Sequence, residues 1–564
     1  MRRAALALFL ALVSWTSAAR AGAPAFPLEA LRPGLVGYGL TEGPGGIERF
    51  EVEVLARQEG FGLGFPLVLV RASGAVIDAG GGVSAGMSGS PVYLAHDGTD
   101  ALLGAVGYVF ADAPGGFALV TPIEEMRAQA GPRPARAGAS GPAPARADWG
   151  AVVPVATPVL VAGLGARALA FLQRELLARA ALPVQALPGG GGGTAVAGGL
   201  EPGSAVAVAW VRGDVDVGAV GTVTEVDGDR LLAFGHPLLG SGPVDWPLLA
   251  AQVTAIVPHR RMPFKLANTA DTVLGRIDQD RPAGVGGRLG GMPELLPVTL
   301  TVATDDAPAG AATTLRFEVV RDPALWPTLV AVAALEALDR VRARVGEGTA
   351  TVHWDIAFRD GPGLRLSETV VDADDVTTAA AWLARAPLAM LAENPFQDPN
   401  VARLGLLVRL EERRRDVEVR QALSDAAPPV AGRVAPLFLR LQPWRRAGEV
   451  RTLDLHWPED LVGRVEVIVR GATWPREPDS LEPPDPDDAP LTFDELLAFL
   501  RERPGGGDLI VEARGEDGVW RRLERVAIAG FVTGRVQLTL EVSAADTGSE
   551  TPPDDAAAAE EARP

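Results

Sequence analysis

The stretch Gly86-Met87-Ser88-Gly89-Ser90-Pro91 predicts a tight loop that leads directly into a β-strand. Glycine on both sides of the serine lets the backbone turn sharply, and Val92-Tyr93-Leu94 has the composition of a strand. A serine in such a turn can act as a nucleophile, because the amides around it can point at a bound carbonyl oxygen. We therefore expect Ser88 to be a nucleophile, with the amides of Gly86 and Ser88 forming an oxyanion hole.

A serine hydroxyl needs a base to accept its proton, and the chain contains five histidines. His236 is the preferred base, because Gly235 before it and Pro237 after it leave its ring at the end of a strand, where it can face a cleft. The other four histidines fit the role less well. His96 is at a hairpin tip and His259 is beside two arginines, whereas His353 and His456 are expected in strands of the C-terminal half.

Two features of the catalytic set stay open. Lys265, the only lysine, is an alternative base, since burial beside Pro263 and Phe264 would favour its neutral form. Asp78 is the nearest acid upstream of the serine and is the expected third member, with Asp245 as the alternative. A serine–histidine pair whose imidazole is oriented by a backbone carbonyl is also possible.

Three segments resemble the SpoIVB family of sporulation serine peptidases. Val83 to Val92, followed by Leu103-Gly104-Ala105-Val106, is similar to the family's serine segment. Gly221-Thr222-Val223-Thr224 with Ala233-Phe234-Gly235-His236 is similar to its histidine segment, and Pro33 to Thr41 to the lead-in of non-sporulation relatives. The resemblance implies an acyl-enzyme peptidase without a cofactor, in which Ser88 and His236 act on a protein or peptide substrate.

The chain departs from that family in two ways. Ser73 and small residues stand where the family has an acid upstream of its serine. The family's histidine precedes its serine, whereas here His236 follows Ser88. The resemblance therefore implies a circularly permuted, trypsin-like β-barrel with the serine-bearing half first. A catalytically inactive, secreted β-rich binding or envelope-assembly protein that retains the peptidase fold is the alternative function.

Composition sets the fold class and excludes several functions. The 564 residues exceed what one hydrophobic core organises, and 66 glycines with 47 prolines favour a mainly β chain with many turns. The absence of cysteine excludes disulfides and thiol chemistry, and a net charge of −19 argues against nucleic acid as a partner. The sequence carries no metal-ligand or cofactor motif. It gives no indication of oligomeric state.

The order of patterns predicts a domain organisation. Arg2-Arg3, an apolar run and a small-residue exit at Ala19-Arg20-Ala21 indicate a signal peptide, so we expect export to the periplasm or beyond, with no integral membrane segment after its removal. C-terminal β-sandwich-like accessory domains with a few helices should follow the peptidase domain. The expected units are a signal peptide (1–21), the serine-bearing half (22–130), a linker (131–148), the histidine-bearing half (149–295), an accessory α+β domain (296–427), an accessory β-rich domain (428–544) and a disordered acidic tail (545–564).

Overall fold

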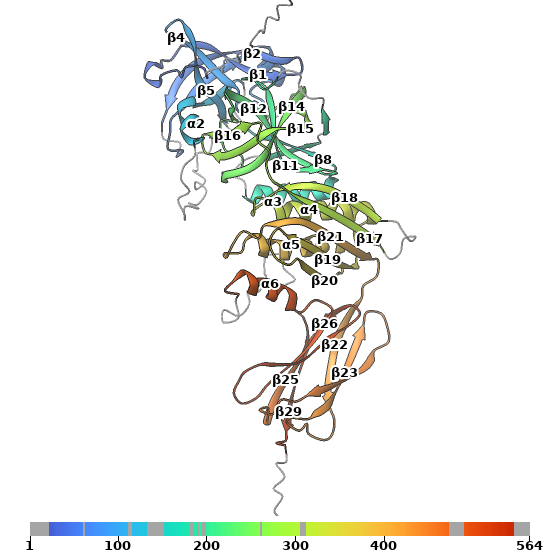
Figure 1. Ribbon diagram of the computed structural model, residues 1–564. Coiled ribbons are helices and arrows are strands. Elements are labelled where there is room, and N and C mark those ends of the chain that lie inside the picture. Colours follow the sequence, from blue (N-terminus) through green and yellow to red (C-terminus); the bar gives the residue numbers. More distant parts are fainter. Residues whose placement is uncertain are drawn as a thin grey trace, which may run out of the picture.

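The computed structural model describes residues 22–59, 62–110, 115–131, 152–179, 184–188, 191–193, 199–259, 262–304, 312–472 and 490–545. Strands make up 54% of the structure and helices 16%, so the expected mainly β fold, with a closed barrel and further β-rich units, is confirmed. The units follow one another along a long axis, from two barrels through a helix-bearing layer to a sandwich (Figure 1). The expected signal peptide, nearly all of the linker and nearly all of the tail lie outside the described residues.

Six strands close the first barrel, in the order β4-β1-β2-β3-β6-β5, with β4 paired back to β5. Asp97 and Gly98, at φ 50° and 77°, form the two-residue turn between β4 and β5. The elements are η1 (Leu28–Ala30), β1 (Val36–Gly43), β2 (Gly46–Gln58), β3 (Leu67–Ser73), α1 (Ala75–Gly80), β4 (Pro91–His96), β5 (Thr99–Phe110), β6 (Phe117–Pro122) and α2 (Ile123–Gln129), followed by β7 (Val152–Pro154) on the edge of β5.

A second ring of six strands runs in the order β11-β14-β15-β16-β13-β12 and closes through the pairing of β12 with β11. Gly228 and Asp229 make the turn of the β12–β13 hairpin, whose strands pair from Asp227 with Arg230 onward. The elements are β8 (Thr157–Ala162), α3 (Ala166–Arg179), β9 (Val184–Pro188), β10 (Gly191–Gly193), β11 (Ala205–Gly213), β12 (Asp216–Asp227), β13 (Arg230–Ala233), β14 (Gly242–Val257), β15 (Phe264–Arg281) and β16 (Gly284–Leu289).

The third unit continues the sheet of the second barrel, because β18 pairs with the end of β11 through Val319 and Val211. Helices α4 and α5 pack on each other and on this sheet, and almost every residue of α4 is buried. The elements are β17 (Leu295–Thr304), β18 (Ala312–Val320), α4 (Trp326–Arg342), β19 (Gly348–Phe358), β20 (Leu364–Asp372), α5 (Val376–Ala392) and β21 (Val401–Glu411).

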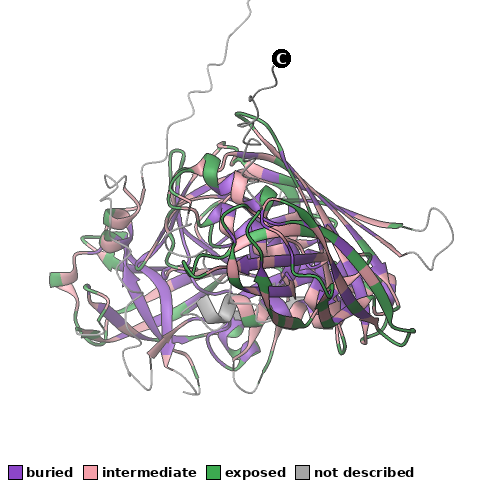
Figure 2. Ribbon diagram, turned by 90° about the horizontal axis from the view of Figure 1, so that it is seen from below, coloured by how far each residue is buried: buried purple, intermediate pink, exposed green. Residues whose placement is uncertain are grey.

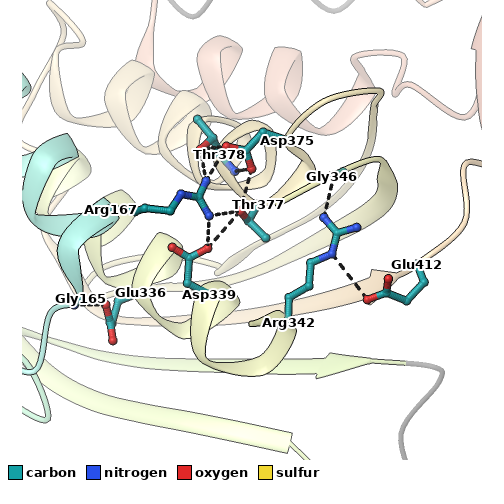
Figure 3. Close-up of polar contacts among 10 residues, drawn as sticks. All are labelled: Gly165, Arg167, Glu336, Asp339, Arg342, Gly346, Asp375, Thr377, Thr378 and Glu412. Atoms are coloured by element: carbon teal, nitrogen blue, oxygen red, sulfur yellow. Dashed lines mark hydrogen bonds and ion pairs between the residues drawn. The ribbon is translucent and has the colours of Figure 1, made fainter. Parts of the chain in front are cut away.

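A polar cluster fastens α3 to these two helices (Figure 3). The Arg167 guanidinium pairs with the carboxylates of Asp339 on α4 and Asp375 before α5. It also donates to the hydroxyls of Thr377 and Thr378, at 3.1 and 3.0 Å. The barrel-side helix is therefore attached to the third unit by a partly buried charge network as well as by apolar packing.

The C-terminal unit is a β-sandwich of two four-stranded sheets, β24-β23-β22-β28 and β27-β26-β25-β29, around a core of its own. Its strands are β22 (Asp416–Ser424), β23 (Val434–Pro443), β24 (Glu449–His456), β25 (Gly463–Gly471), β26 (Asp508–Arg514), β27 (Arg521–Ala527), β28 (Phe531–Thr533) and β29 (Arg535–Val542). Because β22 pairs with β23, the change of unit comes near residue 412, ahead of the expected boundary at 427. Helix α6 (Phe493–Glu502), inserted between β25 and β26, instead buries leucines in the core shared by the second barrel and the third unit.

Buried residues run through the strands and helices of the interior, whereas exposed residues lie on turns and on outward-facing positions of strands and helices (Figure 2). Among the described residues, no helix combines the length and the apolar character that crossing a bilayer requires.

Candidate active site

The loop that carries Ser88 leaves the first barrel before β4 and is bonded to the second barrel. The amide of Thr222 donates to the carbonyl oxygen of Ser88 at 2.8 Å. The hydroxyl of Thr224 donates to the carbonyl oxygen of Gly89 at 2.7 Å. Strand β12 therefore holds the serine loop at the junction of the two barrels.

Glycine at position 89 is a steric requirement of this junction. Gly89 has φ +94°, and a Cβ there would lie 1.9 Å from the Thr222 carbonyl oxygen and 2.5 Å from the Phe234 amide nitrogen. No side chain fits in that space, and the left-handed backbone favours glycine as well. The close approach brings the serine loop against the strand end that precedes His236.

The histidine segment is positioned by the first barrel. Phe234 and Gly235 both have positive φ, 69° and 66°, so the chain turns sharply where β13 ends. The carbonyl oxygen of Gly235 accepts a 2.6 Å hydrogen bond from the Thr121 hydroxyl, and it would lie 2.3 Å from a Cβ at Gly107. The Thr121 hydroxyl therefore fastens the end of the first barrel's strand β6 to the turn before His236.

His236 is fully buried, and its hydrogen bonding selects one tautomer. Its Nδ1 lies 2.8 Å from the carbonyl oxygen of Pro237, which can only accept, so Nδ1 carries the proton in the neutral ring. Burial lowers the pKa of His236 to about 4, against the opposing effect of backbone groups of Pro237 and Val155. At neutral pH the ring is therefore uncharged, and Nε2 presents a lone pair, as a general base requires.

The Ser88 hydroxyl and the His236 ring are not hydrogen-bonded to each other. Both side chains are fully buried, and neither Ser88 Oγ nor His236 Nε2 has a hydrogen-bond partner in the part of the chain that the structure describes. Ser84 Oγ in the same loop and Thr157 Oγ1 are likewise buried without a partner among the described residues. Ser88 and His236 have the chemistry of a nucleophile and a base without the bond that would join them.

Lys265 also borders the serine loop. Its amide donates to the Ala85 carbonyl oxygen at 3.0 Å, and its Cβ and Cδ would each lie 3.3 Å from a Cβ at Gly86. Its Nζ donates to the Thr41 hydroxyl at 2.6 Å and lies 3.5 Å from the hydroxyl of Thr222. Complete burial lowers the pKa of Lys265 to about 7, so a large neutral fraction exists at neutral pH.

The acids expected to complete a triad do not bond to the histidine. Asp78 is exposed on the short helix α1, whereas His236 is fully buried and its Nδ1 faces a carbonyl oxygen. Asp245 accepts from the Glu294 amide at 3.0 Å and pairs with Arg276. The expectation of Asp78 as the third member is therefore wrong, and the arrangement is that of an imidazole oriented by a backbone carbonyl.

A different acid, missed in the sequence, shapes the histidine segment. Asp280 on β15 is almost fully buried and accepts from the amides of Leu238, Leu239 and Ser241 at 2.7, 2.8 and 3.1 Å. It fixes the turn that follows His236 and does not bond to the ring. No local signal identifies it, because Asp280 is one of several acids in a strand far along the chain.

The remaining histidines lie on other segments, and the loop of His259 borders the serine loop, because the Pro263 carbonyl oxygen accepts from the Ala85 amide at 2.7 Å. His96 ends β4 beside Asp97, and His259 follows β14 with Nδ1 3.4 Å from the Met262 amide. His353 is on β19 of the third unit and His456 on β24 of the sandwich.

One of the two expected oxyanion donors is already engaged. The amide of Gly86 donates to the carbonyl oxygen of Ala156 at 3.3 Å, and the Thr222 hydroxyl donates to the Gly86 carbonyl oxygen at 2.9 Å. The Gly86 amide therefore points at a peptide carbonyl, although that carbonyl belongs to the chain itself.

Among the residues with described positions, no group of three or more potential ligands is arranged to hold a metal ion. Comparison of the chain with models of protein families, with curated proteins and with solved structures found no match.

Proposed function

We propose that the chain is an exported serine endopeptidase of the SpoIVB type, with Ser88 as nucleophile and His236 as general base. The observation that carries the proposal is the junction of the two barrels. There the Ser88 loop packs against the histidine strand end, and Ser88 Oγ and His236 Nε2 are both buried without a hydrogen-bond partner among the described residues. The pattern of the serine segment and the export-type N-terminus support the same reading.

In the proposed reaction, Ser88 Oγ attacks the carbonyl carbon of a peptide bond and its proton passes to His236 Nε2. The amide of Gly86 donates to the oxygen that becomes negative, as it now donates to Ala156. The protonated imidazole gives its proton to the leaving amine, and the C–N bond breaks to leave an ester on Ser88. Water then hydrolyses the ester by the reverse proton path.

The carbonyl of Pro237 takes the place of a carboxylate in this scheme. It holds Nδ1 as the protonated nitrogen but carries no negative charge, so it stabilises the imidazolium less than an aspartate would. We therefore expect slower turnover than in a peptidase with a complete triad.

Hydrolysis of an unstructured protein substrate tests the proposal. The wild-type protein should cleave it, Ser88→Ala should abolish cleavage, and Ser73→Ala, at an exposed serine on β3, should have no effect. Cleavage that survives Ser88→Ala would refute the proposal.

A second candidate function is a catalytically inactive binding protein of the cell envelope. It is favoured by the absence of any hydrogen bond from Ser88 to a base among the described residues, and by the engagement of the Gly86 amide. A fluorophosphonate probe separates the two, because only an activated serine reacts with it.

A further inference from the structure

A short segment of the chain lies along the first barrel as an added strand. Strand β7 pairs antiparallel with the end of β5, with Pro154 opposite Tyr108 and Val152 opposite Phe110. The pairing continues where the Val155 amide donates to the Gly107 carbonyl oxygen at 2.9 Å. An extended segment added to a sheet edge in this way is a common mode of peptide recognition.

The same segment reaches the serine loop. One residue after Val155, the Ala156 carbonyl oxygen accepts the Gly86 amide at 3.3 Å. Two residues further on, the Pro158 Cγ would lie 3.4 Å from a Cβ at Gly86. The segment therefore passes from the edge of β5 across the loop that holds Ser88.

Burial shows how closely the segment is packed there. Val155, Ala156 and Thr157 are 0, 5 and 2% exposed, and the Thr157 hydroxyl has no hydrogen-bond partner among the residues that the structure describes. Ser88 itself has no exposure in this arrangement. An external peptide cannot reach Ser88 in this arrangement, and the segment is one of the parts of the chain that pack on the Ser88 loop.

We propose that residues 152–158 occupy, in cis, the groove in which an extended peptide substrate lies, so that this segment must leave before a substrate can bind. The inference rests on the proposed function and adds a substrate class and a means of regulation to it. The groove takes an extended chain with small aliphatic side chains, because the position whose carbonyl meets the Gly86 amide is held by alanine and the one before it by valine.

Val155→Pro tests the proposal, since proline lacks the N–H that donates to Gly107. Losing one hydrogen bond should raise the rate at which a fluorophosphonate labels Ser88 by about tenfold. The matched control is Val345→Pro, at an exposed loop position after α4. Equal labelling rates in Val155→Pro, Val345→Pro and the wild-type protein would overturn the inference and leave the proposed function standing.

Peptide binding gives a readout that needs no catalysis. A labelled heptapeptide with the sequence of residues 152–158 should bind the double variant Ser88→Ala/Val155→Pro more tightly than Ser88→Ala alone, and a scrambled peptide should bind neither. If the peptide binds but Ser88 is never labelled, the proposed groove stands and the proposed peptidase function is refuted. Equal binding of the peptide by the two proteins would overturn the proposal that residues 152–158 occupy the substrate groove.

Hydrogen exchange on the wild-type protein covers the case in which Val155→Pro does not fold. If the segment leaves as a unit, the Val155 amide should exchange faster than amides at the centre of β2, and the heptapeptide should not protect it. Exchange of the Val155 amide only at the rate of the barrel core would contradict the inference.

Discussion

The amide of Thr222 donates to the carbonyl oxygen of Ser88 over 2.8 Å, so the strand that leads to the histidine hairpin is bonded directly to the serine loop. This bond joins residues of different barrels. The arrangement of Ser88 and His236 therefore depends on how the two barrels pack.

Gly89→Ala should disrupt the junction. Its Cβ would overlap the Thr222 carbonyl oxygen, and we expect the free energy of unfolding to fall by about 3 kcal/mol or more. Gly98→Ala is the matched control, since Gly98 also has positive φ but open space around its Cβ, and it should cost about 1 kcal/mol. Urea denaturation of both variants measures the difference, and equal losses would show that the close approach is absent.

The pH dependence of Ser88 labelling identifies the base. With His236 as base, the rate should rise through about pH 4 and stay level from pH 6 to 9, because the ring is already neutral there. With Lys265 as base, the rate should instead rise through about pH 7. A rise centred near pH 7 would transfer the role of base from His236 to Lys265.

Lys265 should make the stability of the fold depend on pH. Its pKa falls from 10.5 when unfolded to about 7 in the native state, so between these values the unfolded chain binds more protons. Stability should therefore rise from pH 7 to 9, on the order of 1 kcal/mol per pH unit. Lys265→Met should remove most of that rise, and an unchanged slope in urea denaturation would show that Lys265 is not buried as a titrating group.

Arg167→Ala should loosen the attachment of α3 to the third unit. Removing the guanidinium leaves the partly buried carboxylates of Asp339 and Asp375 close together, and we expect a loss of about 1–3 kcal/mol. Arg174→Ala, on the same helix but with an exposed guanidinium, is the control and should change stability little. Thermal unfolding compares them, and equal midpoints would mean that the Arg167 network contributes nothing.

Local patterns were enough to predict the turns and the serine loop. Asp97-Gly98 and Gly228-Asp229 form hairpin turns that can be predicted from the sequence alone, because two-residue turns require residues that tolerate positive φ. Gly86 and Gly89 both have positive φ, as the expected sharp turn around Ser88 requires, whereas the complete burial of Met87 and Ser88 follows from the packing of the two barrels.

Contacts between residues far apart in the sequence could not be predicted from local sequence patterns. Asp280 bonds to a turn about forty positions earlier, and the hydroxyl network of Thr41, Ser90 and Lys265 joins three separate segments. Asp78 is the nearest acid upstream of Ser88 in the sequence, but α1 leaves its carboxylate exposed. The pairing of β11 with β18, which joins the second barrel to the third unit, likewise cannot be predicted from the local sequence of either strand.

Labelling of the intact protein with a fluorophosphonate, followed by identification of the modified residue, tests whether Ser88 is an activated nucleophile. We predict label on Ser88 in the wild-type protein and faster in Val155→Pro, none in Ser88→Ala, and a rate lower by about a thousandfold in His236→Ala. Absence of label from Ser88 in both the wild-type protein and a folded Val155→Pro variant would contradict the account.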